Sequence, residues 1–193
     1  MPEQRAPGLP EPRAPALRGL PRAAIALAAV AAIAGARAET SGVSPTGFMV
    51  THRIEVKATP ARVFEALGQI GRWWNVEHSY SGEGRNLSLD LQAGGCFCER
   101  WAGGSVQHLQ VVYVDRAKHA VRLLGGLGPL QGRAVHAVMG IDAAAAEGRT
   151  VLTLTYRVFG PSDVGLDQSA APVDGVLGDA AKRLAAFAEG AKP

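Results

Sequence analysis

The end of the chain constrains its fold most strongly, because one amphipathic helix follows a series of short alternating strands. The apolar stripe of this helix consists of Val173, Val176, Leu177, Ala180, Leu184, Phe187 and Ala188. Charged residues lie largely off the stripe. Gly175 and Gly178 each cost about 1 kcal/mol relative to alanine inside a helix. We therefore expect this helix to depend on packing against the rest of the chain.

Several segments before the helix alternate apolar and polar side chains, as half-buried antiparallel strands do, and others are rich in strand-forming residues. These segments are residues 48–57, 87–92, 96–101, 106–115, 119–124, 133–142 and 150–159. A helix with Thr59 as N-cap and Pro60 in its first turn follows the first strand, and a further short turn carries two tryptophans. The expected fold class is α+β, with two short helices after the first strand and an antiparallel sheet curved around the C-terminal helix.

Residues 1–38 have the organisation of a secretory signal peptide. An arginine-containing segment precedes an uninterrupted apolar run at residues 23–34, and Ala36-Arg37-Ala38 provides a small-x-small cleavage pattern. The run is shorter than the ~20 residues of a membrane span. We expect cleavage after Ala38, a mature protein in the periplasm or outside the cell, and no membrane span in that mature form. An N-terminal anchor helix is the alternative.

Removal of this leader changes the charge of the protein. The whole chain has 20 Lys+Arg and 17 Asp+Glu, but residues 1–38 contain five arginines and two glutamates, which leaves 15 basic and 15 acidic residues. A mature part with no net charge gives no support for a nucleic-acid partner. The mature part is long enough for one domain, which we place at residues 48–190 after a flexible lead at 39–47.

All three tryptophans and both cysteines of the chain lie within residues 72–101. Large aromatic side chains beside a few polar groups are typical of a small-molecule pocket. The predicted ligand-binding residues are Trp73, Trp74, His78, Tyr80, Phe97, Glu99, Trp101 and His108. For any single tryptophan, the alternative is a place in the core.

Glu99 and His108 are the two candidate catalytic residues. Strand alternation places Phe97, Glu99 and Trp101 on one face, and His108 lies on the next strand. A carboxylate and an imidazole inside a cavity have shifted pKa values and act as acid or base. The alternative is that Glu99 pairs with an arginine at the rim and His108 is a surface or hydrogen-bonded core histidine.

Cys96 and Cys98 have three interpretations. A disulfide fits an exported protein, but residues two apart in an extended strand have Cα atoms about 6.5–7 Å apart, at the edge of the range that a bridge spans. A metal site with His78 or His108 is incomplete, since C-x-C supplies only part of a zinc site. We expect two free thiols and no metal.

The chain resembles the START-related SRPBCC superfamily. The resemblance rests on residues 50–67, the Trp73-Trp74 pair, and the sequences GGCFCE at 94–99 and GPLQG at 128–132, and it covers residues 48–189. Within the superfamily it is similar to homologues of the heat-shock-chaperone ATPase activator, close to polyketide cyclase-like proteins. The resemblance implies a helix-grip fold, in which a curved antiparallel sheet holds a long C-terminal helix over an apolar cavity.

Three functions agree with these features. The first is an exported binder of a small apolar or aromatic molecule, without cofactor or catalysis. The second is a cofactor-free cyclase-like or hydrolase-like enzyme that uses Glu99 and His108 in the same cavity. The third is a chaperone-ATPase activator-like interaction protein, which export disfavours because the chaperone and its ATP are cytosolic. The sequence contains no nucleophile elbow, phosphate loop or HExxH motif.

Overall fold

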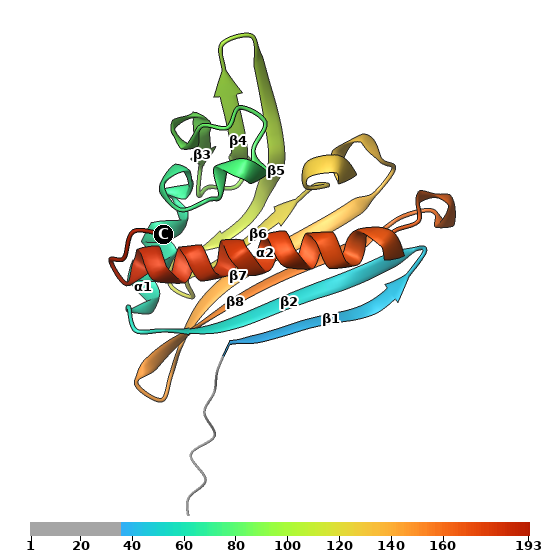
Figure 1. Ribbon diagram of the computed structural model, residues 1–193. Coiled ribbons are helices and arrows are strands. Elements are labelled where there is room, and N and C mark those ends of the chain that lie inside the picture. The colour runs from blue at the N-terminus through green and yellow to red at the C-terminus, as the bar shows by residue number, and fades with distance from the viewer. Residues whose placement is uncertain (1–35) are drawn as a thin grey trace, which may run out of the picture. The chain divides into compact units, whose positions relative to one another are not determined.

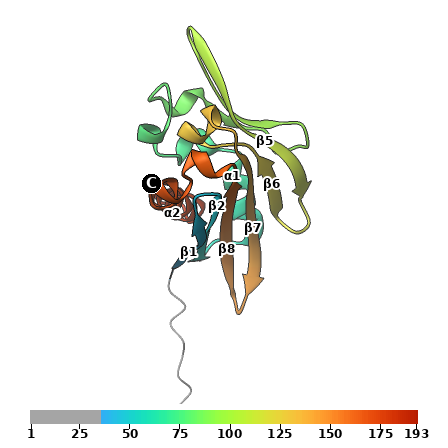
Figure 2. The same ribbon diagram turned by 90° about the vertical axis from the view of Figure 1, so that its right-hand side faces the viewer.

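Eight antiparallel strands form one curved sheet in the computed structural model, which describes residues 36–193 (Figure 1). The strands are β1 (Arg37–Ser44), β2 (Gly47–Val56), β3 (Leu87–Leu89), β4 (Cys96–Trp101), β5 (Gly104–Asp115), β6 (Ala120–Leu124), β7 (His136–Ala146) and β8 (Arg149–Phe159). Their order in the sheet is β1-β2-β8-β7-β6-β5-β4-β3. Figure 2 shows the sheet turning away from β1 and β2 as it continues to β5. The strands from β3 to β8 therefore form a meander, and the N-terminal hairpin joins it beside β8.

Two α-helices and five short 3₁₀ turns complete the described residues. These elements are α1 (Pro60–Leu67), η1 (Ile70–Arg72), η2 (Val76–His78), η3 (Gly84–Asn86), η4 (Gly128–Gly132), η5 (Ser162–Val164) and α2 (Asp167–Ala188). The Thr59 side chain accepts a hydrogen bond from the Arg62 amide at 3.3 Å, and Pro60 occupies the first turn of α1. The predicted start of this helix is confirmed, and its buried residues are Val63, Phe64, Ala66 and Leu67.

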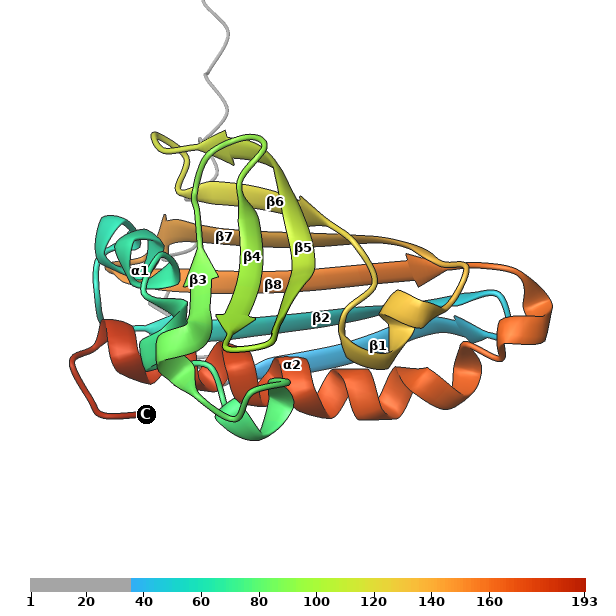
Figure 3. The ribbon, with the colours of Figure 1, turned by 90° about the horizontal axis from the view of Figure 1, so that it is seen from above.

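Helix α2 packs mainly on β2 and also contacts β1, β8 and α1 (Figure 3). Leu177, Ala181 and Leu184 are fully buried in this contact. Gly178 lies over the ring of His52, where a Cβ atom would come within 2.9 Å of the imidazole Cε1. The glycine that weakens the isolated helix thus permits its close approach to the sheet.

His52 forms a buried contact with α2. Its Nε2 lies 3.0 Å from Asp174 Oδ1, within ion-pair distance but without the alignment of a hydrogen bond. The sheet therefore meets this helix through a polar pair as well as through apolar packing.

The predicted flexible lead at residues 39–47 is wrong, because most of it forms β1. Glu39, Thr40 and Ser41 pair with Thr51, Val50 and Met49 of β2. Apolar alternation is absent because β1 is the edge strand and nearly all of its residues are exposed. Backbone pairing rather than burial of side chains forms this strand.

The predicted signal peptide lies outside the described residues up to Gly35. Arg37 and Ala38 are described, and they pair with Arg53 and His52. Cleavage after Ala38 remains a prediction, and it would preserve the pairing from Glu39 onward. Among residues 36–193, no helix combines the length and the apolar character needed to cross a membrane.

Cys96 and Cys98 form a disulfide, so the prediction of two free thiols is wrong. Phe97 pairs with Leu109 and Cys98 pairs with Gln107, which makes His108 the extra residue of a bulge in β5. The Cα atoms of the cysteines are 5.4 Å apart, closer than the spacing of a regular strand. The expectation of free thiols assumed a regular strand, but the pairing of β4 with β5 is irregular between Phe97 and Cys98.

The hairpin of β7 and β8 is longer than predicted. The strands continue to Ala146 and resume at Arg149, so only Glu147 and Gly148 form the turn. Both turn residues have positive φ, 46° and 81°, as a type I′ hairpin requires. The alanines at 143–146 belong to β7, although a run of alanine gives no alternation by which to recognise a strand.

Candidate ligand-binding cavity

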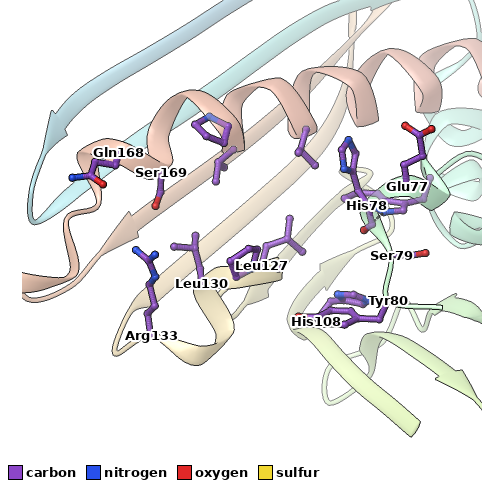
Figure 4. Close-up of a pocket in the computed structure, with 16 residues that line it drawn as sticks. Glu77, His78, Ser79, Tyr80, His108, Leu127, Leu130, Arg133, Gln168 and Ser169 are labelled. Carbon is purple, nitrogen blue, oxygen red and sulfur yellow. Dashed lines mark hydrogen bonds between the residues drawn. The ribbon is translucent and has the colours of Figure 1, made fainter. Parts of the chain in front are cut away.

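A cavity of about 580 Å³ lies between the first half of α2, the η4 segment and the loop that carries η2 (Figure 4). Its lining is Trp74, Glu77, His78, Ser79, Tyr80, His108, Leu127, Gly128, Pro129, Leu130, Arg133, Gln168, Ser169, Pro172, Val173 and Val176. The volume falls within the range of small-molecule sites, about 300–1,000 Å³. The walls come from parts of the chain that are far apart in sequence.

The apolar residues of α2 serve two surfaces. Leu177 and Leu184 are buried on the sheet, whereas Pro172, Val173 and Val176 line the cavity. The half of the helix nearer its N-terminus is thus one wall of the cavity, and the other half holds the helix on the sheet.

Tyr156 positions the second wall of the cavity, which is the η4 segment. Its hydroxyl accepts a hydrogen bond from the Leu127 amide and donates one to the Gly125 carbonyl, both at 2.9 Å. The side chain is fully buried, and burial raises the pKa of Tyr156 to about 12. This buried hydroxyl fixes the chain immediately before η4, where Leu127 and Leu130 reach the cavity.

The third wall of the cavity is the loop that carries η2, and a polar contact attaches it to α2. Asn75 Nδ2 donates to Asp179 Oδ2 at 3.2 Å, and the Asn75 side-chain oxygen accepts from the Glu77 amide at 3.1 Å. The Trp74 indole N–H donates to the His78 carbonyl at 3.1 Å. These bonds hold the η2 loop in the conformation that exposes the Trp74 ring to the cavity.

Glu99 is completely buried and joins the loop after η2 to β5. Its carboxylate accepts hydrogen bonds from the amides of Tyr80 and Ser81 and lies 3.1 Å from His108 Nε2. Burial by itself raises the pKa of Glu99, but the hydrogen bonds from Ser81, Tyr80 and His108 outweigh burial and lower it overall. Glu99 is therefore an ionised acceptor at neutral pH.

His108 connects this buried carboxylate to the cavity. Burial lowers the pKa of His108, and the neighbouring Glu99 offsets the effect only in part, so the imidazole is neutral at neutral pH. Because an ionised carboxylate only accepts hydrogen bonds, Nε2 carries the proton and Nδ1 is an acceptor. Nδ1 forms no hydrogen bond within residues 36–193.

An aromatic cluster supports this end of the cavity. The His108 ring stacks on Phe97 with centroids 4.5 Å apart and lies 5.8 Å from the Tyr80 ring. Phe97 meets Trp74 edge-on at 5.1 Å, and Trp74 meets Trp73 at 6.0 Å. Aromatic contacts thus run from the core to the cavity wall.

Four of the eight predicted ligand-binding residues line the cavity, namely Trp74, His78, Tyr80 and His108. The other four do not. Trp73 is in the core with its indole N–H on the Ala66 carbonyl, Phe97 and Glu99 are buried behind His108, and Trp101 packs against Gly104 at the end of the β4–β5 hairpin.

The two candidate catalytic residues lie together at 3.1 Å, but only His108 reaches the cavity. Within the described part of the chain, no group of three or more His, Cys, Asp or Glu side chains is arranged to hold a metal ion. The structure also adds residues of η4 and the start of α2 that the sequence did not indicate. They carry few aromatic or catalytic side chains, so only their place in the fold identifies them.

No family model and no curated protein matches the sequence. Solved structures do match. CalU16 from Micromonospora echinospora superimposes with a TM-score of 0.54 at 14% identity, over 82% of this chain and 86% of that one. Ms6760 from Mycobacterium smegmatis gives 0.52 at 14%, over 72% and 89%. Major latex-like protein 151 from Panax ginseng gives 0.51 at 12%, over 74% and 97%.

The chain has a helix-grip fold, in which the curved antiparallel sheet holds the long C-terminal helix α2. The fold inferred from the sequence resemblance is confirmed. At 12–14% identity the neighbours establish this fold alone.

Proposed function

We propose that the protein binds a small, mainly apolar or aromatic molecule in the cavity between α2, η4 and the η2 loop. The observation that carries the proposal is an apolar cavity of about 580 Å³ with a few polar groups at its ends. Leu127, Leu130, Val173 and Val176 supply apolar surface, and Trp74 supplies an aromatic one. Burying apolar ligand surface contributes roughly 25 cal/mol per Å², which makes such a wall a source of affinity.

We also propose that the protein acts outside the cytosol. Two features support export: the signal-peptide pattern of residues 1–38 and the Cys96–Cys98 disulfide. Disulfides persist in secreted and periplasmic proteins and are rare where thiols are kept reduced. N-terminal sequencing of exported protein should begin at Glu39, and an intact leader on cytosolic protein would contradict export.

The binding proposal is tested by a thermal-shift and tryptophan-fluorescence screen with fatty acids, flat aromatics and polyketide-like molecules. A ligand at a hundred times its Kd stabilises the native state by about 2.7 kcal/mol. Because Trp74 lines the cavity, its fluorescence should change in the same titration.

A filled-cavity variant supplies the control for this screen. Val176→Phe places a larger side chain in the cavity and should abolish both the thermal shift and the fluorescence change. Val112→Phe, at an exposed position of β5, should keep them. Equal binding by the two variants would place the ligand elsewhere and refute the proposal.

A second candidate function, cofactor-free acid–base catalysis, is favoured by the Glu99–His108 pair. The buried carboxylate orients the imidazole through Nε2, which leaves Nδ1 to accept a proton from a bound molecule. Mass spectrometry distinguishes the two functions, because a binder returns its ligand unchanged after long incubation. Conversion that is lost in Glu99→Gln while binding persists would favour the enzyme.

A further inference from the structure

The two ends of the cavity differ in charge. Figure 4 shows Arg133, Gln168 and Ser169 at one end and Glu77, His78, Tyr80 and His108 at the other. Apolar side chains of η4 and α2 separate the ends. A ligand that spans the cavity therefore meets the cationic Arg133 at one end and the acidic Glu77 at the other.

Arg133 is held in place but keeps most of its donors. Its Nη1 donates to the Val164 carbonyl at 3.0 Å, which fixes the guanidinium against the turn before α2. Arg133 forms none of the ion pairs found among the described residues. Guanidinium N–H groups pair well with a carboxylate, often through two parallel hydrogen bonds.

The opposite end disfavours an anion and favours a hydrogen-bond donor. Glu77 is one of the lining residues, and the Glu99 carboxylate lies within 3.1 Å of His108 on the side away from the cavity. A second negative charge placed there would be repelled by both groups. His108 Nδ1 is an acceptor at this end, so a hydroxyl group of a ligand would find a partner in it.

From this polarity we infer that the ligand is an amphipathic carboxylic acid that binds in one direction. Its carboxylate pairs with Arg133, its apolar body lies along Leu130, Val173 and Val176, and a hydroxyl at the far end donates to His108 Nδ1. The inference rests on the proposed binding function and adds the chemical class and the orientation of the ligand.

Three probes with the same chain length test the class: ω-hydroxydodecanoic acid, dodecanoic acid and dodecanol. Their Kd values are measured by calorimetry with the whole mature protein. The hydroxy acid should bind most tightly, and dodecanoic acid should bind about tenfold more tightly than dodecanol, because both acids pair with Arg133. Equal affinities for the three probes would overturn the inference while leaving the proposed function intact. No binding of any probe, together with no hit in the broader screen, would refute both.

Two charge variants test the orientation. Arg133→Gln should lower the affinity for both acids about tenfold and leave the affinity for dodecanol unchanged. Unchanged binding of dodecanol would also show that the cavity is still folded. Arg62→Gln removes the same charge from the exposed surface of α1 and should have no effect. Glu77→Gln should not weaken the acids. If Glu77→Gln strongly increased the affinity for the acids and Arg133→Gln had no effect, the carboxylate would lie at the Glu77 end. That result would overturn the inference.

The hydroxyl contact has its own measurement. The nitrogen NMR signal of His108 Nδ1, assigned by its loss in His108→Gln, should shift when the hydroxy acid binds and shift much less with dodecanoic acid. The same shift with both acids would show that no hydroxyl reaches His108.

Discussion

The position of one residue, His108, determines how the buried Glu99–His108 pair meets the cavity. As the extra residue of the β5 bulge, His108 is buried next to Leu109, which is also buried, instead of on the opposite face of the strand. Bulges of this kind redirect a side chain and are frequent beside functional sites. The bulge brings the imidazole to Glu99, and the same residue lines the cavity.

The Glu99–His108 pair predicts the acid sensitivity of the fold. The pKa of His108 is lowered from 6.5 in the folded state, so its contribution is complete above pH 6.5 and is lost as the pH falls from there through the folded value. The pKa of Glu99 is lowered from 4.5, so its contribution is lost below that pH as the folded value is approached. Urea unfolding between pH 8 and 4 should show the free energy of unfolding decreasing below about pH 6.5.

Two variants separate the groups in that experiment. Glu99→Gln should reduce the pH dependence below 4.5. Asp142→Asn should steepen the decline, because partial desolvation raises the pKa of Asp142 and this group acts in the opposite direction. A free energy of unfolding that is constant down to pH 5 would contradict the assignment of a neutral, buried His108.

At the scale of elements, the sequence predicted those that bury an alternating or helical apolar face. β2, β8 and α1 were recognised in this way, and α2 was recognised although it begins at Asp167, before the first residue of the apolar stripe. β1 was missed because an exposed edge strand has no apolar face. The bulge was missed because it depends on the pairing between two strands and not on either strand alone.

The disulfide should stabilise β4 only modestly. Closing a loop of three residues contributes about 1–2 kcal/mol in the chain-entropy description. We expect the double variant Cys96→Ser, Cys98→Ser to lose about that much free energy of unfolding. Thiol titration of denatured protein without reductant should find no free thiol, and a count of two would contradict the bridge.

Tyr156 should matter for η4 more than its apolar contacts alone imply. Tyr156→Phe keeps the ring but leaves the Leu127 amide and the Gly125 carbonyl without their partner, which costs about 1–3 kcal/mol for buried groups. Hydrogen exchange should show loss of protection at the Leu127 amide, and ligand affinity should fall with it. Tyr113→Phe is a suitable control, because that hydroxyl bonds Asp115 away from the cavity.

At the scale of the whole domain, the cavity results from a mismatch between one helix and a wide sheet. The eight strands extend from β1 to β3, whereas α2 packs on the three strands β1, β2 and β8. The sequence indicated an uncovered apolar face and one narrow helix to fill it. It could not indicate which loops close the remaining space, since η4 and the η2 loop are placed by Tyr156 and Asn75 through contacts 29 and 104 residues apart.

The pairing of β1 with β2 predicts how truncation of the N-terminus changes the stability of the whole domain. A protein that begins at Glu39 keeps the β1 pairs of Glu39, Thr40 and Ser41 and loses only those of Arg37 and Ala38, so its melting temperature should be only slightly below that of a protein that begins at Ala36. A protein that begins at Phe48 loses β1 entirely. Because each backbone hydrogen bond contributes about 0.5–1.5 kcal/mol net, it should lose more than about 1 kcal/mol. Equal stability of all three proteins would mean that β1 does not contribute to the fold, and the stable domain would then begin at β2.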